Sequence, residues 1–144
     1  MRMTTLFSAA NLLVLPFWVL MIVAPRWRIT KRIARSPLIV LGPVIVYAAL
    51  VLPEIATILP AVARPDLQSI AGLLGSPRGA TIAWAHFLAF DLFVGRWAYL
   101  DAGERGVPVL LMGPLLILTL LLGPVGLGLY LAVRGRWPSR SACG

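Results

Sequence analysis

The segment WAHFLAFDLFVGRW, residues 84–97, is mostly apolar but contains three ionisable side chains. It places His86, Asp91 and Arg96 at intervals of five among aromatic and aliphatic residues. Five residues turn a helix by about 500°, so successive members of this series face directions about 140° apart. The three polar groups would therefore meet different neighbours, which is typical of a helix surrounded by other helices.

These residues lie in the middle of an apolar segment that extends from about residue 77 to about residue 101. Ser76 and Pro77 favour a helix start, because serine is a good N-cap and proline is tolerated at the first helical position. Gly103 follows the segment, and glycine is the common C-terminal stop. A transmembrane helix needs about 20 apolar residues, so this segment is long enough to cross a bilayer.

Three further segments have the same length and character, at about residues 5–24, 37–59 and 108–133. A basic stretch, APRWRITKR, follows the first of them where a signal peptide would have a cleavage site, so we interpret it as a retained helix. We therefore predict an all-α integral membrane protein, a four-transmembrane-helix bundle. Residues 1–135 would form this single domain, and residues 136–144 would form a flexible tail.

Two smaller features refine this fold. The stretch PDLQSIAGLL, residues 65–74, repeats apolar residues at helical spacing and predicts a short interfacial helix between helices 2 and 3. Gly42-Pro43, Gly113-Pro114 and Gly123-Pro124 predict kinked helices, because proline removes a backbone donor. The kinks either shape the packing of the helices or open a cavity between them.

The composition agrees with a membrane protein. Hydrophobic residues make up 60% and charged residues 12% of the 144 residues, against an ordinary charged share of about 25%. The net charge is +8, and the basic residues lie mostly in connectors, where they face anionic lipid headgroups. We therefore expect membrane lipid as a partner and no nucleic acid. The residue usage resembles that of a bacterial protein, which indicates a plasma (inner) membrane.

Metal chemistry is not indicated. Cys143 is the single cysteine, which excludes a disulfide within the chain and a cysteine metal cluster. One histidine with scattered carboxylates lacks the ligand spacing of a zinc site. We expect no metal.

Several polar side chains inside the predicted spans are candidate site residues. The three in the opening stretch are the candidate catalytic residues, and the candidate ligand-binding residues are Trp84, Asn11, Tyr47 and Glu54. Such residues either form interhelical hydrogen bonds or build a polar site between helices. We favour hydrogen bonding for Asn11 and Tyr47 and a functional site for His86 with Asp91, because ionisable groups inside a membrane are usually functional.

The polar residues toward the end of the third predicted span also permit interpretations that involve no functional site. Arg96 either belongs to the site or extends toward the headgroups. Asp101, Glu104 and Arg105 favour a solvated turn.

Three stretches carry a family resemblance, in order along the chain: VLPFWVLMIVAPRWRIT (14–30), WAHFLAFDLFVGRW (84–97) and GPVGLGLY (123–130). They resemble the family of the plant abscisic-acid-deficiency membrane protein. That family is implicated in forming the xanthophyll neoxanthin in plastids and has many bacterial members. The resemblance implies a multi-pass membrane protein that acts on or binds carotenoids.

The chemistry that the resemblance implies is an isomerisation. An epoxide opens and a proton leaves the neighbouring chain to give an allene, which needs an acid and a base and no redox cofactor. As a hypothesis, Asp91 protonates the epoxide oxygen, His86 removes the proton and Arg96 stabilises the alkoxide. The enzyme would be a cofactor-independent carotenoid isomerase.

Other classes of function stay open. The chain could be a non-catalytic subunit that binds an apolar ligand, an accessory partner of another membrane enzyme, or a small transporter that oligomerises. A groove for a polyene would need aromatic walls, for which the chain offers Trp18, Trp84, Trp97, Phe87, Phe90 and Phe93. The alternative for these rings is lipid contact and core packing.

Overall fold

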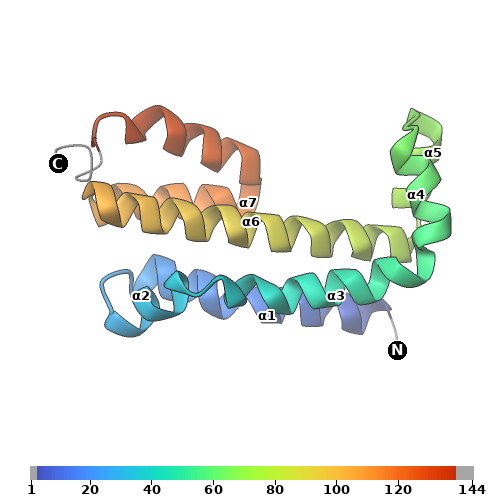
Figure 1. Ribbon diagram of the computed structural model, residues 1–144, viewed down its shortest axis with the longest axis horizontal. Helices are drawn as coiled ribbons and strands as arrows, with labels where there is room; N and C mark the ends of the chain where they lie inside the picture. Colours follow the sequence, from blue (N-terminus) through green and yellow to red (C-terminus); the bar gives the residue numbers. More distant parts are fainter. Residues whose placement is uncertain (1–2, 139–144) are drawn as a thin grey trace. The chain divides into compact units, whose positions relative to one another are not determined.

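A computed structural model describes residues 3–138, which contain helices and turns and no strand (Figure 1). The long helices are α1 (Met3–Val23), α6 (Pro77–Arg105) and α7 (Val109–Arg134). The shorter ones are α2 (Arg28–Arg35), α3 (Leu41–Val51), α4 (Ile55–Ala63) and α5 (Leu67–Leu74), with two 3-10 turns, η1 (Pro37–Val40) and η2 (Leu52–Glu54). The all-helical prediction is confirmed.

Three segments within residues 3–138 are long and apolar enough to cross a membrane: Met3–Val23, Pro37–Ala63 and Val109–Arg134. The prediction of four such segments is wrong in the third. Helix α6 has the length, at 29 residues, but His86, Asp91 and Arg96 lower its hydropathy. The residues that make α6 the candidate site helix are thus the ones that distinguish it from the three apolar segments.

The contacts of the chain divide it into two compact units. Among the described residues, unit 1 comprises 3–14 and 41–89, and unit 2 comprises 15–40 and 90–138. Each unit takes one part of α1 and one part of α6. The single domain predicted for residues 1–135 stays a prediction. Of the predicted tail, residues 139–144 lie outside the described residues.

In unit 1, proline interrupts the second predicted span. Helix α3 ends at Val51, and η2 follows with Pro53 at its centre. Glu54 then leaves the helical conformation, with φ −105° and ψ 7°. Helix α4 starts in a new direction from there (Figure 1). Pro43 also lies in this span, in the first turn of α3, which follows η1 without a break.

The predicted short helix between the second and third spans is confirmed as α5, which packs against α4. Asp66 caps it by accepting a hydrogen bond of 3.0 Å from the Ser69 N–H group. Hydrogen bonding by Ser69 lowers the pKa of the Asp66 carboxyl. Its placement at a membrane interface stays a prediction.

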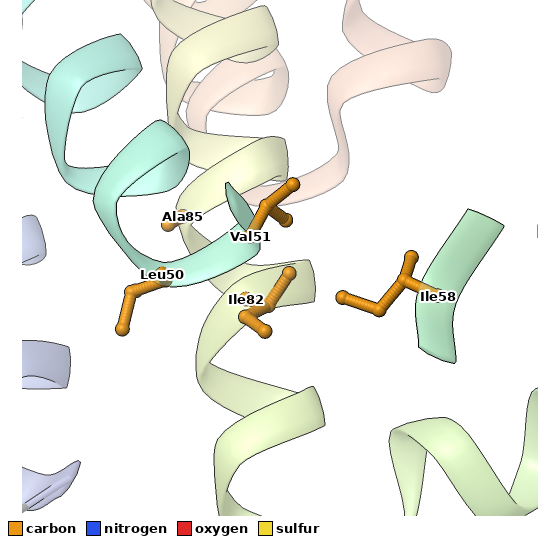
Figure 2. Packing of buried hydrophobic residues seen from close by; sticks show 5 residues of the cluster. All are labelled: Leu50, Val51, Ile58, Ile82 and Ala85. Carbon is orange, nitrogen blue, oxygen red and sulfur yellow. The ribbon is translucent and has the colours of Figure 1, made fainter. Parts of the chain in front are cut away.

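An apolar cluster holds the elements of unit 1 together. Leu50 and Val51 of α3 and Ile58 of α4 form a cluster with Ile82 and Ala85 of α6 (Figure 2). These side chains come from three helices, and they are all buried. In lipid, such packing stabilises a fold mainly through van der Waals contacts, because the surroundings are also apolar.

In unit 2, the kink predicted at Gly123-Pro124 is confirmed. Leu122 has φ −139° and ψ 54°, which interrupts the helical backbone of α7 two residues before Pro124. Pro114 lies in the same helix without a non-helical residue beside it. Only the later proline therefore opens the backbone.

The basic connector after α1 is more ordered than the sequence indicated. Residues 28–35 form α2, an amphipathic helix that buries Thr30 and Ala34. Its basic side chains are exposed, namely Arg28, Lys31, Arg32 and Arg35. This helix therefore separates an apolar face from a cationic one.

Candidate functional site

Asp91 of α6 lies in unit 2 against the kink of α7. A Cβ atom at Gly123 would come within 2.1 Å of the Asp91 Oδ1 atom, so a larger residue would displace the carboxylate. Pro124 lacks an N–H group, and the backbone carbonyl four residues earlier therefore loses its helical donor. Within residues 3–138 the Asp91 carboxylate makes no hydrogen bond and no ion pair. An uncommitted carboxyl group thus lies beside interrupted backbone.

Trp18 of α1 fixes a second close approach to α6. Its side chain is 1% exposed, and a Cβ atom at Gly95 would come within 2.3 Å of its Cη2 atom. The indole nitrogen has no hydrogen-bond partner among the described residues. Of the two interpretations, the structure therefore favours core packing for this ring.

A polar cluster joins the end of α6 to α7. Asp101 accepts hydrogen bonds from the Arg105 Nε atom at 2.8 Å, from the Arg134 Nη2 atom at 2.9 Å and from the Tyr130 hydroxyl group. The Trp97 ring packs edge-on against Tyr130, with 5.7 Å between the ring centres. The Arg134 guanidinium lies 5.1 Å from the Trp97 ring centre.

This cluster corrects the prediction of a solvated turn. The Asp101 side chain is only 16% exposed and binds both arginines. Arg105 also donates to the Trp137 carbonyl, at 3.0 Å, which brings the residues after α7 to the same place. Of the predicted turn residues, only Glu104 is exposed.

Two hydrogen bonds attach α6 to the connector after α1. The Arg96 Nη2 atom donates to the Arg35 carbonyl at 3.0 Å, where α2 ends. The Tyr99 hydroxyl group donates to the Pro25 carbonyl at 2.6 Å. Arg96 therefore satisfies a carbonyl that a helix end leaves without a partner, and a role in stabilising an alkoxide stays a prediction.

The predicted ligand-binding residues lie in unit 1. The Trp84 indole donates to the Asn11 Oδ1 atom at 3.1 Å and stacks on Phe7 with ring centres 5.5 Å apart. The Asn11 amide donates in turn to the Phe7 carbonyl at 2.8 Å. Asn11 thus makes the interhelical hydrogen bond that the first interpretation expects.

The remaining predicted residues of unit 1 form two separate pairs. Tyr47 and His86 meet edge to face, with 5.4 Å between ring centres. Glu54 pairs with Arg78 at 3.2 Å on an exposed surface. The candidate base His86 therefore belongs to unit 1, whereas Asp91 and Arg96 belong to unit 2. Among residues 3–138, no group of His, Cys, Asp and Glu side chains could hold a metal ion.

The three stretches that carried the family resemblance meet inside unit 2. Trp18 of the first stretch packs on Gly95 of the second. Asp91 and Trp97 of the second contact Gly123 and Tyr130 of the third. The resemblance therefore corresponds to a contiguous group of side chains.

All three stretches lie within the part of the chain that matches a known family. A family model described as ABA DEFICIENT 4-like matches residues 5–130. The chain is 34% identical over 110 residues to Protein ABA DEFICIENT 4, chloroplastic, of Arabidopsis thaliana. The aligned region covers 72% of this chain and 50% of that protein. The chain thus spans about half the length of this curated relative, and no solved structure matches it. Since the family model covers most of its length, the chain belongs to the ABA DEFICIENT 4-like family.

Proposed function

We propose that this protein isomerises an epoxy-xanthophyll in a membrane, with Asp91 as the proton donor to the epoxide oxygen. The observation that carries the proposal is the position of Asp91, an uncommitted carboxyl group at the Gly123-Pro124 kink. Membership of the family supports a carotenoid as the substrate class. We place the protein in the inner membrane of a bacterium, where its three apolar segments would cross the bilayer.

The proposed reaction balances without an electron acceptor. One carbon–oxygen bond of the epoxide breaks, and the oxygen takes a proton from the Asp91 carboxyl group. The neighbouring carbon loses a proton to a base, and the electrons of that bond form the new double bond of the allene. A general acid of this kind contributes about 10²–10⁴-fold to a rate.

The other two predicted catalytic residues keep their proposed roles as separate tests. Arg96 has five N–H donors, and its bond to the Arg35 carbonyl uses one of its terminal nitrogens. It therefore retains donors for an alkoxide. His86 lies in unit 1 beside Tyr47, and its role as the base is tested by replacing it alone.

The experiment uses the purified full chain with an added 5,6-epoxy-carotenoid, and chromatography with absorption spectra detects the allenic product. We expect turnover by the unmodified protein and a loss of about 100-fold or more in Asp91→Asn. Glu104→Gln is the matched control, because it removes an exposed carboxylate from the same helix. Full turnover by correctly folded Asp91→Asn protein would defeat the assignment of the acid.

A second candidate function is non-catalytic binding of a carotenoid or another apolar ligand. It is favoured by the aromatic rings on the unit 2 part of α6, where Phe90 is 60% and Phe93 is 50% exposed. A carotenoid that copurifies with the protein, without turnover of an added epoxide, would support binding alone. The absence of both would remove carotenoids from the proposal. In this second proposal the protein binds the ligand either as a homo-oligomer or together with a partner membrane enzyme.

A further inference from the structure

Unit 2 contains a cavity that the proposed chemistry does not use. Its volume is about 240 Å³, and it lies between α1, α2, α6 and the start of α7. The deep wall is apolar and consists of buried side chains, among them Met21, Val107 and Met112. Tyr99 and Pro25 also line the cavity, and the Tyr99 hydroxyl group donates a hydrogen bond to the Pro25 carbonyl. This arrangement offers an apolar pocket with an open mouth.

The mouth of the cavity is cationic. Arg26, Lys31 and Arg35 line it and are exposed, whereas Glu104 is the one carboxylate in the lining. Three positive charges against one negative charge leave an excess of two. Arg28 and Arg32 lie on the same short helix, α2, but do not line the cavity. Only some of the basic residues of the connector therefore line the cavity.

The cavity lies at the ends of two candidate membrane spans. Helix α1 ends at Val23 and α7 begins at Val109, and residues just beyond both ends line the cavity. The ends of spans are where lipid phosphates occur in a bilayer, and basic pockets between helices at this level suit anionic headgroups.

We propose that this cavity binds one anionic phospholipid, with its phosphate against Arg26, Lys31 and Arg35 and its first methylene groups against the apolar wall. The volume of about 240 Å³ is below the roughly 300–1,000 Å³ of pockets that enclose a whole drug-sized ligand. The cavity therefore suits a headgroup and the start of its chains, and it is too small to enclose a carotenoid.

The first test compares charge pairs on one helix. Native mass spectrometry of the detergent-solubilised full chain would count bound phosphatidylglycerol and phosphatidylcholine with the same acyl chains. We expect one retained phosphatidylglycerol and weaker binding of phosphatidylcholine. Lys31→Gln with Arg35→Gln should weaken phosphatidylglycerol binding about 30-fold, since each basic residue near an anionic surface contributes about fivefold. The bond from Arg96 is kept, because it uses the backbone carbonyl of Arg35.

Arg28→Gln with Arg32→Gln is the matched control, because it removes the same charge from α2 outside the cavity. Binding within about twofold of the unmodified protein is the expected result. An equal loss in both pairs would mean a diffuse charge effect and would overturn the proposal. Displacement of the lipid by inorganic phosphate at the same concentration would also overturn it, because a simple anion site would then suffice.

The second test fills the cavity and leaves its charges in place. A Cβ atom at Gly113 meets no atom within 4 Å, and this glycine lines the cavity. Gly113→Leu should therefore lower lipid binding without strain in the helix. Gly128→Leu is the matched control, since Gly128 has the same open space in α7 and does not line the cavity. Unchanged binding in Gly113→Leu would show that the lipid lies elsewhere.

Discussion

The two units of this protein use polar side chains in different ways. In unit 2, Asp101 collects three donors, and the Tyr130 ring beside it is completely buried. In unit 1, the Trp84–Asn11 hydrogen bond and the Glu54–Arg78 ion pair are both exposed. Polar groups in unit 2 therefore hold α6 against α7. The polar contacts of unit 1 lie on its surface and add to the packing of its apolar cluster.

Both units contain glycines that leave no room for a Cβ atom, but the neighbours differ. Gly95 and Gly123 of unit 2 lie against the Trp18 and Asp91 side chains of other long helices. In unit 1, a Cβ atom at Gly79 would come within 1.8 Å of the Leu73 carbonyl oxygen in α5. The crowded glycines of unit 2 therefore allow close contacts between long helices, and the one in unit 1 allows the tight connection between α5 and α6.

The largest effect is expected for Asp101→Ala. This change leaves Tyr130, Arg105 and Arg134 without their shared acceptor, and removing one member of a buried charged network costs about 3–5 kcal/mol. The three charged side chains, Asp101, Arg105 and Arg134, are 16–25% exposed, so we expect the lower end of this range. Titration of the free energy of unfolding in mixed detergent micelles measures it. Glu104→Ala, an exposed carboxylate in the same turn, should change little, and equal losses in both variants would contradict the buried cluster.

Gly95→Ala should come next. The new methyl group would overlap the Trp18 ring, and overpacking of this kind costs about 1–3 kcal/mol. The same titration, together with the fluorescence spectrum of the tryptophans, would detect a displaced ring. Gly128→Ala should be neutral or stabilising, because its site is open and alanine favours a helix. A neutral Gly95→Ala variant would mean that α1 and α6 do not approach so closely.

Much of the fold could be predicted from patterns that are local in sequence. Apolar runs of about 20 residues predicted the segments that contain α1, α3, α6 and α7, and the Gly123-Pro124 pair predicted the kink. The predicted number of apolar spans was wrong because it included α6. That segment is long enough to span a bilayer, but its polar residues lower its hydropathy. Helix α2 was missed since its basic residues indicated a connector.

The site could be predicted only one residue at a time. The sequence pointed to Asp91, but the Asp91–Gly123 contact depends on how the kinked α7 lies against α6, which no spacing within one helix encodes. The same holds for Asp101 with Tyr130, which are 29 residues apart. Gly95 offered one clue in the sequence. A glycine inside a helix lowers helix stability, so its presence there indicates a place where another part of the chain approaches closely.

A smaller effect is expected for Trp84→Phe in unit 1. It removes the donor to Asn11 and keeps a ring that can stack on Phe7. Interhelical hydrogen bonds of this kind contribute about 0.6 kcal/mol in membrane proteins. A double-mutant cycle with Asn11→Leu should give a coupling energy of this size. A coupling of several kcal/mol would remove the difference between the units.

The smallest effect is expected for Glu54→Gln. The two side chains of its ion pair with Arg78 are 36% and 41% exposed, and exposed pairs contribute about 0–1 kcal/mol because water and salt screen them. The unfolding free energy in detergent should fall by no more than this, and the fall should shrink as the salt concentration rises from about 0.05 M to 0.5 M. Arg78→Gln is the matched variant and should behave alike. A loss of about 3 kcal/mol that salt does not change would place the pair in apolar surroundings, since breaking one partner then leaves an unpaired charge there. In that case η2 would lie inside the membrane and unit 1 would depend on its polar residues as unit 2 does.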